Sequence, residues 1–179
     1  MSQPTSQDLQ ALPLFGGIGP DALARFAERC EVVSVPAGQI IFTEGEAARS
    51  LYVVHAGQLE IVKQCPRGEM CLGTVMPGEC VGEMSFIDMQ PRSATVRSAM
   101  PTTLWVWAYA SIHERYCTDL KCAMLLVMNI ARELSRRLRR ADDLLVETSP
   151  APPPPRSWPQ ASSSPAVTAQ RAPVVPSTR

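Results

Sequence analysis

A carboxylate and a guanidinium occur close together in residues 81–96, VGEMSFIDMQPRSATV, which interrupt an otherwise strand-like pattern. Glu83 is a strong hydrogen-bond acceptor, and Arg92 carries a fixed charge and a planar fork of donors that suits paired phosphate oxygens. Gly82 lets the backbone approach a ligand closely, and GEMSFID can form one helical turn whose free amides favour an anion. If Arg92 neutralises a phosphodiester, Glu83 is left for a sugar hydroxyl. The pair therefore fits a nucleotide with a free ribose hydroxyl and one negative charge.

The elements that must position this pair are short strands. Apolar runs recur at roughly ten-residue spacing over residues 31–108, with PAGQ, AGQ and PGEC as turns between them, which predicts an antiparallel sandwich or barrel. A short helix, DALARFAERC, precedes the strands, and helices follow over residues 109–147, with a break around Thr118, which together with Asp119 could cap the longer piece. The expected fold class is mainly β with flanking helices: a double-stranded β-helix, or jelly roll, followed by a long C-terminal helix.

The long helix carries a regular row of apolar residues. At alternating spacings of four and three these are Leu120, Met124, Val127, Ala131, Leu134, Leu138, Ala141 and Leu145. Such a seam is typical of a coiled coil and predicts a homodimer through the helix at residues 119–147. An amphipathic helix that packs on the chain's own core is the alternative. The arginines off the seam are expected to form a solvated face, with DNA contact as the weaker alternative; they are Arg132, Arg136, Arg137, Arg139 and Arg140.

Composition divides the chain into three parts. Residues 1–11 are expected to form a disordered arm, residues 12–147 the folded domain, and residues 148–179 a proline-rich disordered tail. The tail is either solvated or a docking site for an SH3-like proline reader. The net charge is +0, but no acidic residue follows Glu147, so the body is mildly acidic and does not resemble a surface that holds nucleic acid.

Cysteine and histidine usage argues against a metal or other cofactor. The 6 cysteines include no CxxC pair, and only 2 histidines could join them, so we expect reduced, small core residues. No stretch approaches the roughly 18 to 20 apolar residues of a membrane span, and the N-terminus lacks the features of a signal peptide. These observations predict a cytoplasmic protein that does not contact a membrane.

Residues 81–96 closely resemble the phosphate-binding cassette of cyclic nucleotide-binding domains, which occur in catabolite-activator-type regulators, cyclic nucleotide-dependent kinases and nucleotide-gated channels. The residues that match with the family's spacing are Gly82, Glu83, Pro91, Arg92, Ser93, Ala94 and Thr95. The resemblance implies that Glu83, assisted by the Gly82 backbone, binds the ribose 2′-hydroxyl, and that Arg92 pairs with the cyclic phosphate. It also implies that the amides of Met84 and Ser85 and the amide or hydroxyl of Ser93 complete the phosphate cradle.

The ligand implied by the resemblance is cAMP or cGMP, because a serine at position 93 does not separate adenine from guanine. Asn129 and Arg132 both lie in roughly suitable places to cover the base, and the spacing selects neither. The implied function is a regulatory module that senses the nucleotide and signals to an unidentified protein effector through its C-terminal helices.

Three other functions are weighed against this one. A catabolite-activator-type transcription regulator without its own DNA-reading domain is one, since residues 148–179 lack the periodicity of a helix-turn-helix. A ligand-free dimerisation module, in which Glu83 and Arg92 form an ordinary salt bridge, is another. A hydrolase of cyclic nucleotides is not expected, because His55 and His113 do not belong to a metal-type spacing.

Overall fold

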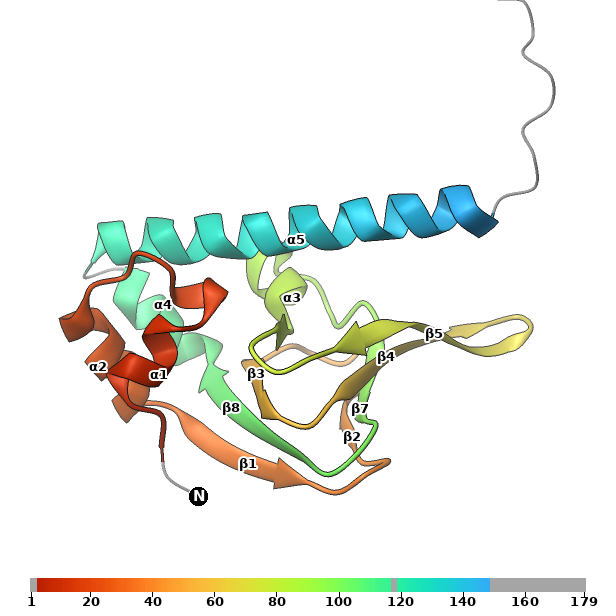
Figure 1. Cartoon of the computed structure of the whole chain (residues 1–179), viewed down its shortest axis with the longest axis horizontal. Coiled ribbons are helices and arrows are strands. Elements are labelled where there is room, and N and C mark those ends of the chain that lie inside the picture. Colours follow the sequence, from red (N-terminus) through yellow and green to blue (C-terminus); the bar gives the residue numbers. More distant parts are fainter. Residues whose placement is uncertain (1–2, 117–118, 149–179) are drawn as a thin grey trace, which may run out of the picture. The chain divides into compact units, whose positions relative to one another are not determined.

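The computed structural model describes residues 3–116 and 119–148, so the tail from residue 149 onward, with Cys117 and Thr118, lies outside the described residues. Within the described part, eight strands form two antiparallel sheets with the orders β1-β8-β3-β6 and β2-β7-β4-β5 (Figure 1). Their bounds are β1 Glu31–Val35, β2 Ile40–Phe42, β3 Ser50–Ala56, β4 Leu59–Cys65, β5 Gly68–Val75, β6 Cys80–Val81, β7 Thr95–Ser98 and β8 Thr102–Ala108. The expected jelly roll followed by a long helix is confirmed.

The helices flank these sheets. They are α1 Ser6–Gln10, the 3₁₀ helix η1 Pro13–Phe15, α2 Pro20–Glu28, α3 Glu83–Asp88, α4 Tyr109–Tyr116 and α5 Leu120–Thr148. In Figure 1, α1, α2 and α4 gather at one end of the sheets, and the β4–β5 hairpin lies at the other end. The chain divides into two compact units, residues 1–141 and 142–179, and all contacts described below lie within the first. No helix in the described ranges is both long and apolar enough to cross a membrane.

Two clusters of buried apolar side chains hold the first unit together. One lies between the sheets and includes Val54 and Leu104. The other joins β8 to the helices, where Phe15 packs edge-on against Trp107 with ring centroids 5.5 Å apart. Leu126 and Ile130 of α5 belong to this second cluster, so burial of apolar surface fixes the first half of α5 against the domain.

Polar contacts complete the attachment of α5. Asp119 Oδ1 accepts from the Cys122 amide at 3.0 Å, which caps the helix start. The side-chain amide of Asn129 donates to the carbonyls of Leu14 at 3.0 Å and Gly16 at 2.9 Å. Asn129 is therefore committed to the N-terminal segment, and its use as a cover for a bound base is not supported by its contacts.

Within the predicted disordered arm of residues 1–11, the described residues 3–11 are ordered. Thr5 and Asp8 make a capping box at the start of α1, with the Asp8 amide donating to the Thr5 hydroxyl at 3.2 Å. Leu9 is completely buried in the second cluster. The segment is ordered because one apolar anchor and one cap act together, although the rest of it is polar.

The cysteines only partly follow their expected role. Cys30, Cys80 and Cys122 are buried as expected, and burial raises the pKa of the Cys30 thiol to about 12. Cys71 is exposed on β5, and Cys65 is half-buried at the end of β4. The prediction of small core residues is therefore wrong for Cys71.

Candidate functional site

Gly82 begins the cassette, between β6 and α3. Its φ of 90° lies in the left-handed region, which favours glycine. A Cβ at this position would lie 2.4 Å from Arg92 Nη1 and 2.9 Å from the Ser50 carbonyl oxygen. Glycine is thus required because the Arg92 guanidinium itself passes against the Gly82 backbone.

The residues that the sequence predicts to bind a ligand lie around one cavity. Gly82, Glu83, Met84, Ser85, Arg92 and Ser93 all line it. Phe42 of β2 and Arg137 of α5 also contribute to its wall. Its volume of about 70 Å³ is well below the roughly 300 Å³ at the lower end for small-molecule sites. The cavity therefore has to widen before it can hold a nucleotide.

Glu83 is almost completely buried, with 2% of its surface exposed. Arg137 Nη1 donates to Glu83 Oε1 at 2.7 Å, and this is the ion pair that Glu83 makes within the described residues. Burial raises the pKa of Glu83, and the positive charge of Arg137 opposes that rise. The expected alternative, a Glu83–Arg92 salt bridge, is not the contact that the structure forms.

Arg137 is in turn held by two further groups. Its Nη2 donates to the carbonyl oxygen of Cys80, and its Nε lies 3.2 Å from Glu133 Oε1. Burial alone would raise the pKa of Glu133, but the Arg136 hydrogen bond and the charge of Arg137 together hold it below its usual range. The guanidinium is thereby fixed between α5 and the start of the cassette.

Arg92 is also buried, with 4% of its surface exposed, but its partners belong to β3 and to the start of α4. Its Nη2 donates to the Ser50 carbonyl at 2.7 Å and its Nη1 to the Tyr109 hydroxyl at 3.0 Å. Its Cζ lies 4.0 Å from the centroid of the Phe42 ring. The Tyr109 hydroxyl donates to the Gly82 carbonyl at 2.5 Å, so one tyrosine ties together both ends of the cassette.

The Nε of Arg92 is buried and has no hydrogen-bond partner in the described part of the chain, as is also the case for Arg25 Nε and Trp105 Nε1. A buried donor without an acceptor is rare in folded proteins and requires an explanation. An anionic oxygen entering the cavity that Arg92 lines would supply the missing acceptor.

The remaining cassette residues have weaker ties. Ser85 is buried, and its hydroxyl donates to the Pro91 carbonyl at 3.5 Å. The Ser93 hydroxyl has the Met84 sulfur as its partner at 3.6 Å, and Lys63 Nζ donates to the Ser93 carbonyl at 2.9 Å. The Ser93 hydroxyl can be diverted to a ligand at little cost, because a sulfur is a weak acceptor.

Arg137 is the cavity-lining residue that the sequence reasoning missed. It was assigned to a solvated arginine face, and that assignment is wrong because its guanidinium is held by Glu83, Glu133 and Cys80. The available signal was helical spacing, since Ile130, Glu133 and Arg137 follow one another on the face that α5 turns toward the domain. Arg132 likewise bonds to Asn129 Oδ1 at 2.8 Å.

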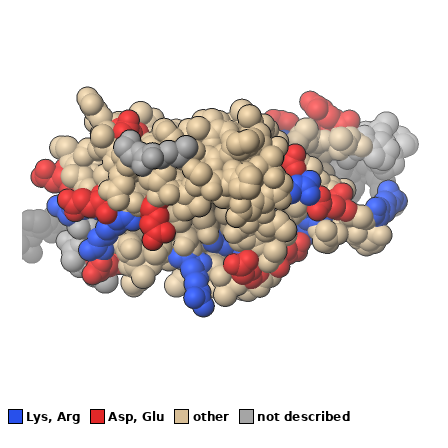
Figure 2. All heavy atoms as spheres, turned by 90° about the horizontal axis from the view of Figure 1, so that it is seen from below, with Lys and Arg blue, Asp and Glu red and all other residues tan. Residues whose placement is uncertain are grey.

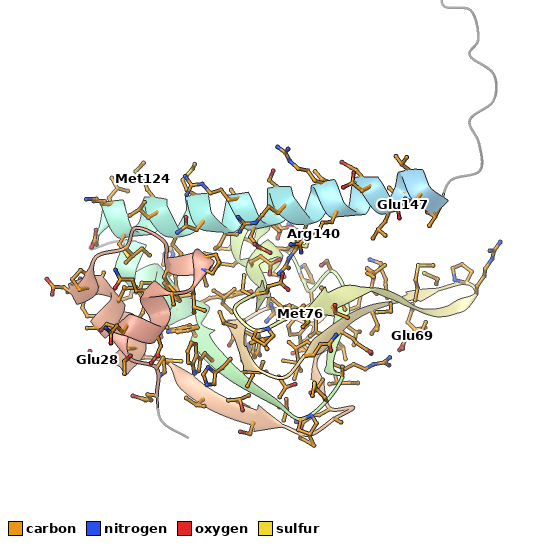
Figure 3. All side chains as sticks on the ribbon, in the orientation of Figure 1. Glu28, Glu69, Met76, Met124, Arg140 and Glu147 are labelled. Atoms are coloured by element: carbon orange, nitrogen blue, oxygen red, sulfur yellow. The ribbon has the colours of Figure 1, made fainter. Side chains whose placement is uncertain are left out.

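The opposite face of α5 is apolar and uncovered. Its exposed apolar residues in the first unit are Leu120, Met124, Val127, Met128 and Leu138. Met124 is 60% exposed, and Figure 3 shows it on the side of α5 that faces away from the sheets, whereas Arg140 faces toward them. Most of the predicted seam is therefore exposed, while Leu134 packs against the domain.

Charge is mixed on the surface. On the face in Figure 2, Lys and Arg lie interspersed with Asp and Glu, and no single sign covers it. Within the two described ranges, no cluster of three His, Cys, Asp or Glu side chains could hold a metal ion.

The comparisons with known proteins agree with the fold described above. Residues 32–116 match the family model described as the cyclic nucleotide-binding domain. The chain is 34% identical over 139 residues to the cyclic AMP receptor protein of Thermus thermophilus. The matched region makes up 75% of this chain and 61% of that protein. It is 30% identical over 135 residues to a CRP-like cAMP-activated global transcriptional regulator of Mycobacterium tuberculosis, covering 75% and 58%.

A solved structure gives the same fold. The cyclic nucleotide-binding domain from Methylobacillus flagellatus superposes with a TM-score of 0.72 at 22% identity, over 80% of this chain and 82% of that one. The chain spans about three fifths of the length of the two curated relatives.

Proposed function

The chain contains a domain of the cyclic nucleotide-binding family, related to regulators of the cyclic AMP receptor type, and on that premise we propose that it binds cAMP or cGMP around Glu83 and Arg92. The names of the two curated relatives favour cAMP. The observation that carries the proposal is that one cavity is lined by both a buried carboxylate, Glu83, and a buried guanidinium, Arg92, whose Nε has no partner among the described residues.

Glu83 would receive the ribose 2′-hydroxyl. An ionised carboxylate offers about four lone-pair sites on two oxygens, and Arg137 occupies a site on Oε1. Acceptor capacity thus remains for a sugar hydroxyl. Burial makes that hydrogen bond strong, because a charged acceptor removed from water gains most from a matched donor.

Arg92 would pair with the cyclic phosphate. Its unpartnered Nε supplies one donor, and the amides of Met84 and Ser85 and the amide or hydroxyl of Ser93 supply others. The Phe42 ring behind the guanidinium keeps it in place while its edge faces the anion. Charge-assisted contacts of this kind are roughly twice as strong as neutral hydrogen bonds.

Binding would signal through α5. The cavity is too small in the present arrangement, so a nucleotide has to move the groups that close it, and Arg137 of α5 is one of them. A ligand that interacts differently with two positions of α5 shifts their populations. The effector would be an unidentified protein that recognises one of these positions.

Calorimetric titration with cAMP and cGMP tests this function, using the natural chain, Arg92→Gln and the control Arg97→Gln. Arg97 lies on β7 and is held by Glu60 at 2.9 Å and Glu69 at 2.6 Å, outside the cavity. We expect micromolar or tighter binding that falls by about 100-fold or more in Arg92→Gln and is unchanged in the control. If neither nucleotide produced heat, a ligand-free dimerisation module would be the better interpretation of the chain's function.

Dimer formation through α5 is a second part of the proposal. It is supported by the uncovered apolar face of Leu120, Met124, Val127, Met128 and Leu138, since apolar patches on soluble domains commonly mark interfaces. Light scattering should show a dimer that dissociates in Met124→Glu. The control Ile40→Glu alters an exposed apolar residue on β2 and should leave the dimer intact.

Transcription regulation is the alternative function, because both curated relatives are of the cyclic AMP receptor type and one is named a transcriptional regulator. The contacts of Arg132, Arg136 and Arg137 within the chain weigh against their use on DNA phosphates. A gel shift with operator-like DNA, with and without cAMP, separates the two functions, since binding that weakens steeply with salt would support the alternative.

A further inference from the structure

An apolar groove lies beside α5, on the side where α3 and α4 adjoin it. Its volume is about 890 Å³, far larger than that of the cassette cavity. Its apolar lining comes from α3 and the turn after it, from α4 and from α5, and includes Phe86, Ile87, Met89, Pro91, Ala110 and Val127. Ile87 and Met89 are exposed large apolar residues. Exposed apolar surface of this kind on a soluble domain commonly marks an interface.

The groove is continuous with the exposed apolar row of α5. Val127 belongs to both, because it lines the groove and is a seam residue that remains exposed. The exposed large apolar residues of α5 in the first unit are far fewer than the roughly 20 to 30 residues that each side of a standard interface uses. A dimer through the seam therefore needs further surface, and the groove adjoins the seam.

One flank of the seam is turned toward this chain's own α3. In the heptad that the seam defines, the g positions are Ala123, Ile130 and Arg137. Ala123 and Ile130 are buried, and Arg137 pairs with Glu83, the first residue of α3. The g flank of α5 is therefore the side on which the groove lies.

The other flank carries an exposed methionine that is not part of the seam. Met128 occupies an e position. In a parallel two-stranded coil, the e residues of one helix lie beside the g residues of the other. Met128 of a second copy would thus lie beside Ala123 and Val127 of this one, at the edge of the groove. Methionine suits an irregular apolar recess, because its side chain is unbranched and flexible.

We propose that the groove between α3, α4 and α5 is the docking site for a second copy of this chain, whose Met128 inserts there when the two α5 helices pair. The inference rests on the dimer proposed above, and it adds the helix of the cassette to the interface. Ser85 lines both the groove and the cassette cavity, so the second copy would contact the same helix whose first turn lines the nucleotide site.

Sedimentation equilibrium of the full chain without nucleotide tests the proposal with Ile87→Glu, Met128→Lys and an equimolar mixture of the two variants. Each substitution should weaken the dimer by about tenfold or more, because it places a charge in an apolar contact. In the mixture, a heterodimer should form about tenfold more tightly than either homodimer. In that heterodimer the two introduced charges, of opposite sign, meet in one groove, and the other groove has its natural contact.

Ile40→Glu and Met100→Lys are the matched controls. They introduce the same charges at apolar residues that are 53% and 47% exposed, against 43% for Ile87 and 49% for Met128, and neither lines the groove. Both should keep the association of the natural chain, and their mixture should gain nothing. Thermal unfolding shows whether each variant is folded. Ala110→Glu, which changes the α4 wall of the groove, replaces Ile87→Glu if that variant does not fold.

Two results would overturn the inference. A dimer that keeps its association in Ile87→Glu and Met128→Lys but dissociates in Met124→Glu would mean that the seam alone joins the copies. A mixture with no gain over the two separate variants would mean that Ile87 and Met128 do not meet. Failure of the proposed dimer looks different and would overturn both, since the natural chain itself would then sediment as a monomer.

Discussion

The two ends of the cavity are built from different parts of the molecule. At the acidic end, Glu83 pairs with Arg137 on α5, while at the basic end Arg92 is held by Ser50 and Tyr109 and rests on Phe42. Both side chains are buried to a similar degree. They differ in what they are attached to, since Ser50 and Phe42 belong to strands and Tyr109 begins α4, whereas Arg137 lies on the helix proposed to move.

On the proposed function, this difference would separate affinity from signal. A phosphate at Arg92 would meet a guanidinium held by β3, by the Phe42 ring of β2 and by the start of α4. A ribose at Glu83 would meet a carboxylate whose other partner, Arg137, lies on α5. Because coupling between two sites needs a group that both of them bias, the ribose end is the one that can transmit occupancy to the helix.

The largest expected effect comes from the residue that lies between the two ends. Gly82→Ala would place a Cβ 2.4 Å from Arg92 Nη1 at a φ of 90°. We expect a loss of about 2 kcal/mol in the free energy of unfolding and a loss of nucleotide binding at both ends. Chemical denaturation and titration measure these effects.

Gly73→Ala is the matched control for this prediction. A Cβ at Gly73 on β5 would meet no atom within 4 Å. Its stability and affinity should stay close to those of the natural chain. Equal destabilisation by the two substitutions would show that the close approach of Arg92 to Gly82 has no special weight.

A smaller effect, the pH dependence of cAMP affinity, should distinguish the acidic end of the cavity from the basic end. Burial raises the pKa of Glu83, so it takes up its proton at a pH above the roughly 4.3 of an ordinary glutamate. The ionised form is the acceptor, so cAMP affinity should fall by about tenfold as the pH is lowered through this raised pKa. In Glu83→Gln, binding should be weaker throughout and flat over the same interval, and a persisting slope would assign the titration to another group.

The smallest expected effect comes from Tyr109, which contacts Arg92 and the start of the cassette. Tyr109→Phe removes the hydroxyl that accepts from Arg92 and donates to Gly82. Loss of these bonds should change cAMP affinity by about fivefold or less. Tyr52→Phe is the control, since its ring lies 5.7 Å from Arg92 Cζ and no hydrogen bond joins its hydroxyl to Arg92 in the described part of the chain.

The sequence was sufficient for the features that local patterns specify. Glycine turns and short apolar runs predicted the jelly roll, because strand spacing is visible in any single segment. The cassette residues were predicted to share a cavity, and Glu83, Arg92 and Ser93 do line one. Their roles toward a nucleotide stay a prediction, as do the seam's dimer and the tail from residue 149.

The sequence was insufficient where two distant segments decide the outcome. Arg137 lies in a run of arginines that is typical of a solvated face, and its burial depends on how α5 is rotated against β6 and α3. The contact with Glu83 is set by Leu126, Ile130 and Asn129, which fix that rotation by packing on the N-terminal helices and β8. The order of residues 5–10 was missed for a different reason, since the capping box around Thr5 was visible and only the burial of Leu9 was not.

Hydrogen exchange tests the separation of affinity and signal most directly. Amide protection would be compared for peptides covering residues 82–95 and residues 126–141, without ligand, with saturating cAMP and with saturating 2′-deoxy-cAMP. The account predicts that both nucleotides protect the cassette, whereas only cAMP changes the protection of α5. Equal changes in α5 with the two nucleotides would contradict it, because the helix would then respond to the phosphate end.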